Sequence, residues 1–246
     1  KVCPVLTKDG KLTPDLIRPV LDMHENEHWV DPRLVYVSNP TEVGTVYTKE
    51  ELEDLYAFCK RHDLYFYIDG ARLAAALAAK EETHLTFPDL PKLCDAFYIG
   101  GTKVGAMFGE ALVLVNENFK ERFRFNMKQK GAILAKGWFL GVQFEELFKN
   151  NLYIEAGAHS IAMMKPIKEA FEKAGIPLLC EAPTNQIFPI FPNALADEIN
   201  KKYLTTFQCK PDKDHTCLRF CTSWATNENA VKDFVEDFEE MCNRLL

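Results

Sequence analysis

Short apolar runs alternate with amphipathic segments along the first half of the chain. The segment from Thr48 to about Arg61 reads as a helix, because Glu51 follows Thr48 at the spacing of a capping box. Strands that alternate with such helices predict βαβ units and a mostly parallel sheet. The last run follows its predecessor after only a short loop, so we expect it to be antiparallel. The predicted strands are 34–38, 65–69, 96–100 and 111–115.

The pattern changes in the second half of the chain. Two strand-like runs flank a helix there, and a long amphipathic helix follows, which predicts an α+β domain. We expect a large α/β domain over residues 1–152 and a small domain over residues 153–246. The predicted helices are 13–23, 48–61, 71–79, most of 116–148, 153–173, 195–203 and 227–245, and the later strands are 186–191 and 216–221.

Charged residues stand at or just beyond the ends of two predicted strands. Asp69 ends one apolar run, and Lys103 follows another after Gly100, Gly101 and Thr102. In an open α/β sheet, ligands bind outside the carboxyl ends of the strands. A carboxylate for the ring nitrogen and a lysine for the Schiff base are what pyridoxal 5′-phosphate (PLP) requires of a protein. Taken alone, Asp69 could instead cap the following helix, and Lys103 could lie in an exposed glycine-rich turn.

Six sequence blocks, in order, resemble a known family. The chain is similar to the threonine aldolase / β-eliminating lyase family of PLP-dependent enzymes, in its low-specificity branch, and the resemblance spans nearly the whole chain. The blocks are SNPTEVGT (38–45), IDGARL (68–73), GGTKVGA (100–106), KQKGAILAKG (128–137), TNQIFPI (184–190) and LRFCTSWAT (218–226).

The resemblance implies both a fold and a reaction. The fold would be α/β, of the type I PLP-dependent transferase (aspartate aminotransferase-like) class. Its large domain would lack an N-terminal part, which in the family cups the cofactor phosphate and stacks on its ring. The implied reaction is cleavage of threonine, or a related β-hydroxy-α-amino acid, to glycine and an aldehyde. Three alternatives remain open: a β-eliminating lyase, an aminotransferase, or a catalytically empty fragment that acts as a structural or interaction domain.

The resemblance also implies roles for residues that bind the cofactor. Lys103 matches the Schiff-base lysine and Asp69 the partner of the ring nitrogen, so both are expected to be catalytic. Thr102 matches a residue that donates to the phosphate, and Arg72 matches one that approaches the cofactor hydroxyl and the substrate carboxylate.

Two further residues are expected to contact the substrate. Arg219 lies in an alternating strand, and its planar guanidinium suits a carboxylate. Thr41 lies in a loop where other threonine aldolases place a histidine for the substrate's β-hydroxyl group, and this chain has no histidine there. The identity of the base is therefore left open.

Composition and charge narrow the partners, the cellular location and the ligands that this chain could have. A net charge of −7 argues against a nucleic-acid partner, and no apolar run is long enough to span a membrane. The eight cysteines include no C-x-x-C pair, which favours a reducing, cytoplasmic location. The grouping of His215, Cys217 and Cys221 lacks a second ligand pair, so we expect no metal. The expected partners are an amino-acid substrate and further copies of the chain, as a homodimer or a homotetramer.

Overall fold

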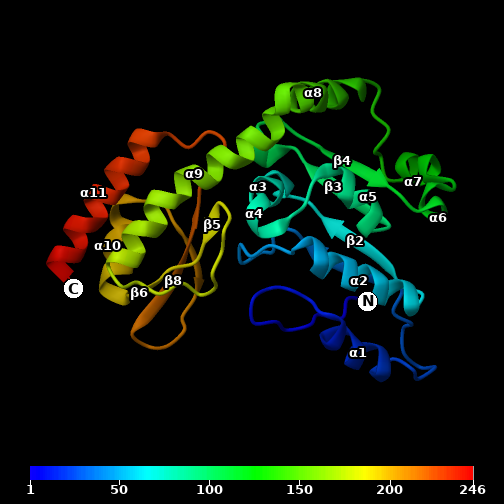
Figure 1. Cartoon of the computed structure of the whole chain (residues 1–246), viewed down its shortest axis with the longest axis horizontal. Helices are drawn as coiled ribbons and strands as arrows, with labels where there is room; N and C mark the ends of the chain where they lie inside the picture. The colour runs from blue at the N-terminus through cyan, green and yellow to red at the C-terminus, as the bar shows by residue number, and fades with distance from the viewer. Residues whose placement is uncertain (246) are drawn as a thin grey trace.

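The computed structural model describes residues 1–245 and shows two units joined by a long helix (Figure 1). Each unit has its own sheet and its own hydrophobic core. The connecting helix, α9 (Leu152–Lys173), begins beside the first core and ends beside the second. Within the described residues, no helix has the length and apolar content needed to cross a membrane.

The first unit is built on a sheet with strand order β1-β2-β3-β4. Neighbouring strands among β1, β2 and β3 pair in parallel, and β4 pairs with β3 in the antiparallel sense. The expected antiparallel member is thus confirmed. The strands are β1 (Leu34–Ser38), β2 (Tyr65–Asp69), β3 (Ala96–Gly100) and β4 (Glu110–Leu114).

Capping residues determine where the first two helices of this unit begin. Thr13 accepts a hydrogen bond from the Leu16 amide at the start of α1, and Thr48 and Glu51 form the predicted capping box of α2. The helical segments of the first unit are α1 (Pro14–Met23), α2 (Lys49–Arg61), α3 (Leu73–Ala78), α4 (Lys80–Thr83), α5 (Leu90–Leu93), α6 (Glu117–Lys120), α7 (Phe123–Gln129) and α8 (Trp138–Phe148), with short 3₁₀ turns at Phe87–Asp89, Thr102–Val104 and Lys149–Asn151.

The two faces of the first sheet differ in side-chain type. Residues such as Val37 and Ile68 point into the core formed with α2 and α3. Because side chains alternate along a strand, their neighbours occupy the opposite face. There Tyr36, Tyr67 and Tyr98 form a row across three strands, with Tyr36 stacked on Tyr67 at a ring-centroid distance of 5.5 Å. This aromatic row leads to the end of β2, where Asp69 lies.

Most of 116–148 is helical, as expected, but the helix is divided into three separate segments. Only α6, α7 and α8 form, and the stretch from Lys130 to Gly137 is irregular. Gly131 has a positive φ of 72°, a conformation that ends a helix easily when the residue is glycine. The chain therefore leaves the helix near Gly131 and does not return to it until Trp138, although the residues between include apolar ones.

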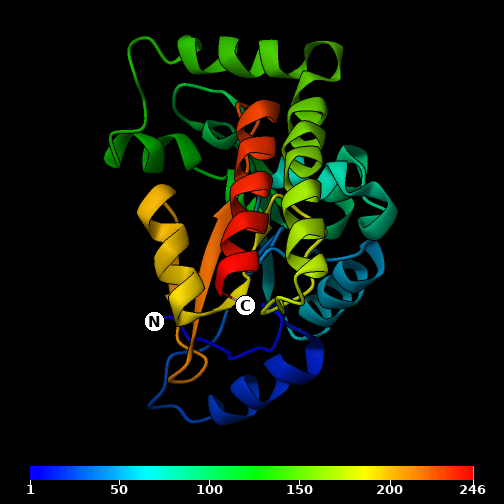
Figure 2. The ribbon, with the colours of Figure 1, turned by 90° about the vertical axis from the view of Figure 1, so that its left-hand side faces the viewer.

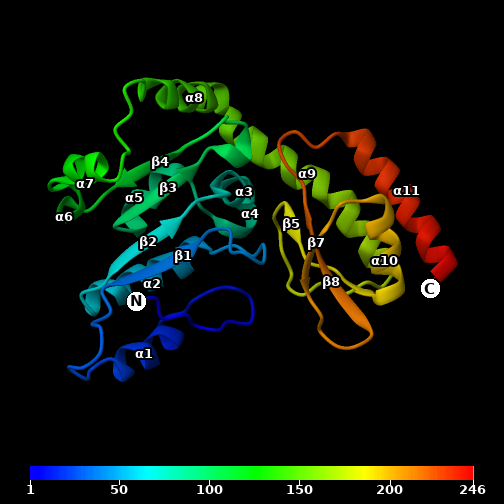
Figure 3. The same ribbon diagram turned by 180° about the vertical axis from the view of Figure 1, so that it is seen from behind.

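The second unit packs three helices on a small antiparallel sheet (Figures 2 and 3). The predicted strand over 186–191 is divided in two, because Pro189 has no amide hydrogen to continue the ladder. Strand β7 was not predicted. The elements that follow α9 are β5 (Gln186–Ile187), β6 (Ile190–Pro192), α10 (Asn193–Lys202), β7 (Thr206–Cys209), β8 (His215–Cys221) and α11 (Glu228–Leu245).

Helix α9 holds the two units together through a close crossing with α3. A Cβ atom added to Gly157 would lie 2.3 Å from the carbonyl oxygen of Ala74, so only glycine permits this approach. Tyr153 of α9 belongs to the first core, and Met164 and Phe171 of the same helix belong to the second. The domain boundary between residues 152 and 153 stays a prediction, since α9 serves both cores.

Candidate active site

The carboxyl ends of β2 and β3 bring the predicted acid and amine to one edge of the sheet. Asp69 is the last residue of β2, and Lys103 lies in the turn Thr102–Val104 that follows β3. The close backbone approach of the two strand ends requires Gly70, because a Cβ atom there would lie 2.0 Å from the carbonyl oxygen of Tyr98. Parallel pairing thus produces the juxtaposition that the sequence predicted.

Three donors hold the Asp69 carboxylate. The hydroxyl of Tyr36 donates a hydrogen bond to Oδ2, and the hydroxyl of Tyr98 donates one to Oδ1. The amide of Ala71 also donates to Oδ1, at 2.9 Å. Burial, reinforced by the Asp69 charge, raises the pKa of both tyrosine hydroxyls, so they remain protonated donors. The tyrosines come from β1 and β3, on either side of β2, and fix the carboxylate between them.

The amine of Lys103 lies in an environment that disfavours its charge. Lys103 is exposed as a residue, but partial burial of its amine lowers the pKa of the amine, and the nearby guanidinium of Arg72 lowers it further. The carboxylates of Glu42, Asp69 and Glu110 act in the opposite direction. Among residues 1–245, the Lys103 amine has no ion-pair partner within hydrogen-bonding distance. A lowered pKa increases the fraction of the amine that is neutral, and therefore nucleophilic, at a given pH.

Arg72 completes this group of charges. It is the N-cap residue of α3, its side chain is largely buried, and its Nη1 lies 3.7 Å from Oε2 of Glu42. Glu42 belongs to the loop that follows β1. The structure therefore brings Asp69, Arg72 and Lys103 together, with Glu42 as a fourth charged member.

Thr102 has a partner of its own. Its hydroxyl donates to Oε1 of Glu110, the first residue of β4, at 3.2 Å. Oε2 of the same carboxylate accepts from the amide of Gly101 at 2.6 Å. The contact of Thr102 with a cofactor phosphate stays a prediction.

Thr41 is buried in the loop after β1, and its hydroxyl already forms a hydrogen bond within that loop. It is 2.7 Å from the hydroxyl of Thr45, whose own proton goes to the carbonyl of Asp9. The loop is fastened to the second unit, because Thr184 donates to the carbonyl of Gly44 and Gln186 to that of Glu42, at 2.7 and 2.6 Å. A substrate contact of Thr41 stays a prediction.

Arg219 lies in the second sheet. It is in β8, half-buried, and its backbone is paired with Thr206 of β7. No hydrogen bond or ion pair within the described residues joins it to Asp69, Arg72 or Lys103. Its role in binding a substrate carboxylate stays a prediction.

The sequence reasoning missed several residues of this site. Asn39 follows β1 and is fully buried, its amide donates to the carbonyl of Asp69, and its side-chain Nδ2 has no partner among residues 1–245. Tyr36, Tyr98 and Glu110 were also missed. A signal existed for the tyrosines, since each stands two residues before the end of a strand and so on the same face as Asp69.

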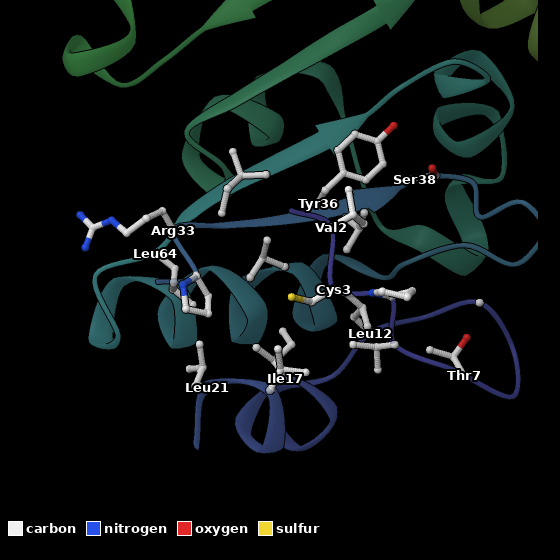
Figure 4. A pocket seen from close by; sticks show the side chains of 18 of the residues that line it. Val2, Cys3, Thr7, Leu12, Ile17, Leu21, Arg33, Tyr36, Ser38 and Leu64 are labelled. Atoms are coloured by element: carbon white, nitrogen blue, oxygen red, sulfur yellow. The ribbon is translucent and has the colours of Figure 1, made fainter. Parts of the chain in front are cut away.

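A groove that adjoins this site lies at the open edge of β1 (Figure 4). It has a volume of about 870 Å³ and is bounded by the first twelve residues, α1 and β1. Its lining includes Tyr36, Thr41 and Glu42, but neither Asp69 nor Lys103. Across residues 1–245, no group of three or more His, Cys, Asp or Glu side chains has the arrangement to hold a metal ion.

Comparisons with solved structures place the chain in a known class of fold. A threonine aldolase of Leishmania major has a TM-score of 0.95 and 46% identity, over 98% of this chain and 70% of that one. Serine palmitoyltransferase of Sphingomonas wittichii has a TM-score of 0.64 and 14% identity, over 87% and 55% of the two chains, and so shows the fold alone. The fold is that of the type I PLP-dependent enzymes, and the predicted fold class is confirmed.

Sequence comparison then gives the family. The family model of the beta-eliminating lyases matches residues 1–191. A low specificity L-threonine aldolase of Pseudomonas sp. (strain NCIMB 10558) is 29% identical over 246 residues, 96% of this chain and 68% of the relative. The chain thus spans about two thirds of the length of the curated relatives that it matches over nearly its whole sequence. It belongs to the beta-eliminating lyase family, as the sequence blocks predicted.

Proposed function

We propose that this protein is a PLP-dependent lyase that cleaves threonine, or a related β-hydroxy-α-amino acid, to glycine and an aldehyde. The observation that carries the proposal is the meeting of Asp69, Arg72 and Lys103 at the ends of two parallel strands. The similarity to threonine aldolases supports this reaction over elimination or transamination.

The residues of the site fit pyridoxal 5′-phosphate. The fixed Asp69 carboxylate suits the ring nitrogen, and the Lys103 amine, with its lowered pKa, suits the aldehyde. The Nδ2 of Asn39 is a buried donor without a partner among residues 1–245, on a residue whose backbone amide contacts the carbonyl of Asp69, and a polar group of the cofactor would be a partner for it. Bound PLP supplies a sink for the electron pair that the breaking Cα–Cβ bond releases.

The chain's own residues bind, orient and hold protons. Asp69 would keep a proton on the ring nitrogen, and the Thr102 hydroxyl would turn from Glu110 to donate to the phosphate. Arg72 and Arg219 would bind the substrate carboxylate and orient the bond to be cleaved. Lys103 would hold the cofactor before the substrate amine replaces it. A cytoplasmic location and a homodimer or homotetramer are part of the same proposal.

The test is a visible absorbance spectrum of the purified protein with added PLP, followed by borohydride reduction and peptide mapping. A band that disappears on reduction, with the label on Lys103, is the expected result. Lys103→Ala should abolish both. Absence of any band in the folded protein, or a label on another lysine, would overturn the assignment of the site.

Products then distinguish the reactions. With threonine as substrate, we expect equimolar glycine and acetaldehyde, measured by chromatography and by an aldehyde assay. Formation of pyruvate from serine without cleavage of threonine would instead identify an eliminating enzyme on the same scaffold.

A further inference from the structure

One peptide unit just before Lys103 is held from both sides. The carbonyl oxygen of Gly100 accepts a hydrogen bond from the hydroxyl of Tyr153 at 3.0 Å. The amide of Gly101 donates to Oε2 of Glu110 at 2.6 Å. These two atoms belong to the same planar group, the peptide bond between Gly100 and Gly101. Two side chains from different elements thus fix the orientation of one plane.

The local sequence needs such support. Both residues of the unit are glycines, which restrict the backbone least. Contacts leave no room for side chains there, since a Cβ atom at Gly100 would be 2.3 Å from the carbonyl oxygen of Ala71, and one at Gly101 would be 2.7 Å from that of Gly109. The turn with Lys103 begins at the next residue, Thr102, so the plane sets the direction from which the turn departs.

The two side chains differ in kind. Tyr153 lies in the first turn of α9 and is fully buried, and burial raises the pKa of its hydroxyl, which remains a donor. Glu110 begins β4, is more exposed, and uses its second oxygen to accept from the Thr102 hydroxyl. A donor on the carbonyl and a carboxylate on the amide polarise the peptide in the same sense, which strengthens both bonds.

We propose that Tyr153 and Glu110 are positioning residues that orient the Gly100–Gly101 peptide and thereby aim the Lys103 amine into the site. This role deepens the proposed function and rests on it. It also connects Lys103 with α9, the helix that joins the two units.

The test compares Glu110→Gln, Tyr153→Phe and the double variant with two matched controls. Glu117→Gln removes an exposed carboxylate that pairs with Lys120, and Tyr203→Phe removes a hydroxyl bonded to Asp237 in the second unit. Two readouts apply to Lys103. One is the rate of PLP adduct formation at fixed pH. The other is the rate of reductive methylation by formaldehyde and cyanoborohydride as a function of pH, followed by peptide mass spectrometry, which requires no cofactor.

We expect each single variant to slow adduct formation at Lys103 about tenfold, the loss expected from one hydrogen bond in which a donor or acceptor is strong. The double variant should be little slower than either single one, because both act on the same peptide unit. Glu110→Gln should also move the methylation midpoint to lower pH, since it removes a negative charge. Arg72, Glu42 and Asp69, the other charged groups facing the amine, are unchanged in every variant. The controls should match the wild type in both readouts.

Rates within twofold of the wild type in both folded single variants would overturn the proposal. So would losses that multiply in the double variant. A purely structural role would lower the unfolding temperature while leaving the methylation rate of Lys103 unchanged in Tyr153→Phe, a variant that alters no charge. If Tyr153→Phe fails to fold, the rates measured for Glu110→Gln, at its more exposed position, still test the proposal. Should the wild type form no adduct with PLP, the proposed function fails, and the methylation readout still tests the orientation of Lys103.

Discussion

At the residue scale, the charge state of Lys103 depends on an opposed pair, Arg72 and Glu42. A positive neighbour lowers the pKa of an amine and a negative neighbour raises it, so the two variants should move Lys103 in opposite directions. Arg72→Gln should shift the pH midpoint of Lys103 methylation upward, and Glu42→Gln should shift it downward. Peptide mass spectrometry at a series of pH values measures both. Shifts in the same direction would contradict the assigned electrostatics.

The hydrogen bonds to Asp69 give a second prediction at this scale. Tyr98→Phe removes one donor from Oδ1 and frees the carboxylate to rotate. We expect PLP affinity to fall about tenfold, which corresponds to the lower end of the about 1.5–3 kcal/mol that a hydrogen bond to a charged group contributes, because Tyr36 and Ala71 remain in place. An absorbance titration measures this. Tyr65→Phe, on the same sheet face, is the control, and equal affinities of the two variants would refute a role for Tyr98.

At the scale of elements, the crossing of α3 and α9 depends on a single missing side chain. Gly157→Ala would place a methyl group 2.3 Å from the carbonyl oxygen of Ala74, so the helices must separate. We expect a loss of about 1–3 kcal/mol in the free energy of unfolding, measured by urea denaturation. The control is Gly141→Ala in α8, where an added Cβ atom would have no atom within 4 Å among residues 1–245 apart from its own helix turn. It should be neutral or stabilising by up to about 1 kcal/mol. Equal stabilities of the two variants would contradict the close crossing.

At the scale of the whole molecule, α9 should make the two units unfold together. Phe171 of this helix is fully buried among Phe191, Phe234 and Phe238 in the second core. Phe171→Ala should cost about 3–5 kcal/mol. Calorimetry should show one transition at a lower temperature, because the same helix supplies Tyr153 to the first core. Two separate transitions, with only one displaced, would show that the units are independent. The exposed Phe125 provides a nearly neutral alanine control.

How much of the site could be predicted from the sequence depended on distance along the chain. Asp69 and Lys103 follow apolar strands, and a parallel sheet places such ends together whatever the rest of the fold does. Glu110 begins an antiparallel strand, so it reaches the same edge from the opposite direction. Tyr153 lies fifty-three residues from the carbonyl that it contacts. Neither periodicity nor spacing encodes such a contact, because it arises only when α9 packs on α3.

The fastening of the loop after β1 has a consequence for motion. Gln186, in the second sheet, donates to the backbone of Glu42, and the side chain of Glu42 lies 3.7 Å from the guanidinium of Arg72. A rotation of the second unit would therefore move Glu42 toward or away from Arg72. Because Glu42 offsets the charge of Arg72, this movement would change the electrostatic potential at the Lys103 amine. The protonation of one amine would then report the angle between the two halves of the molecule.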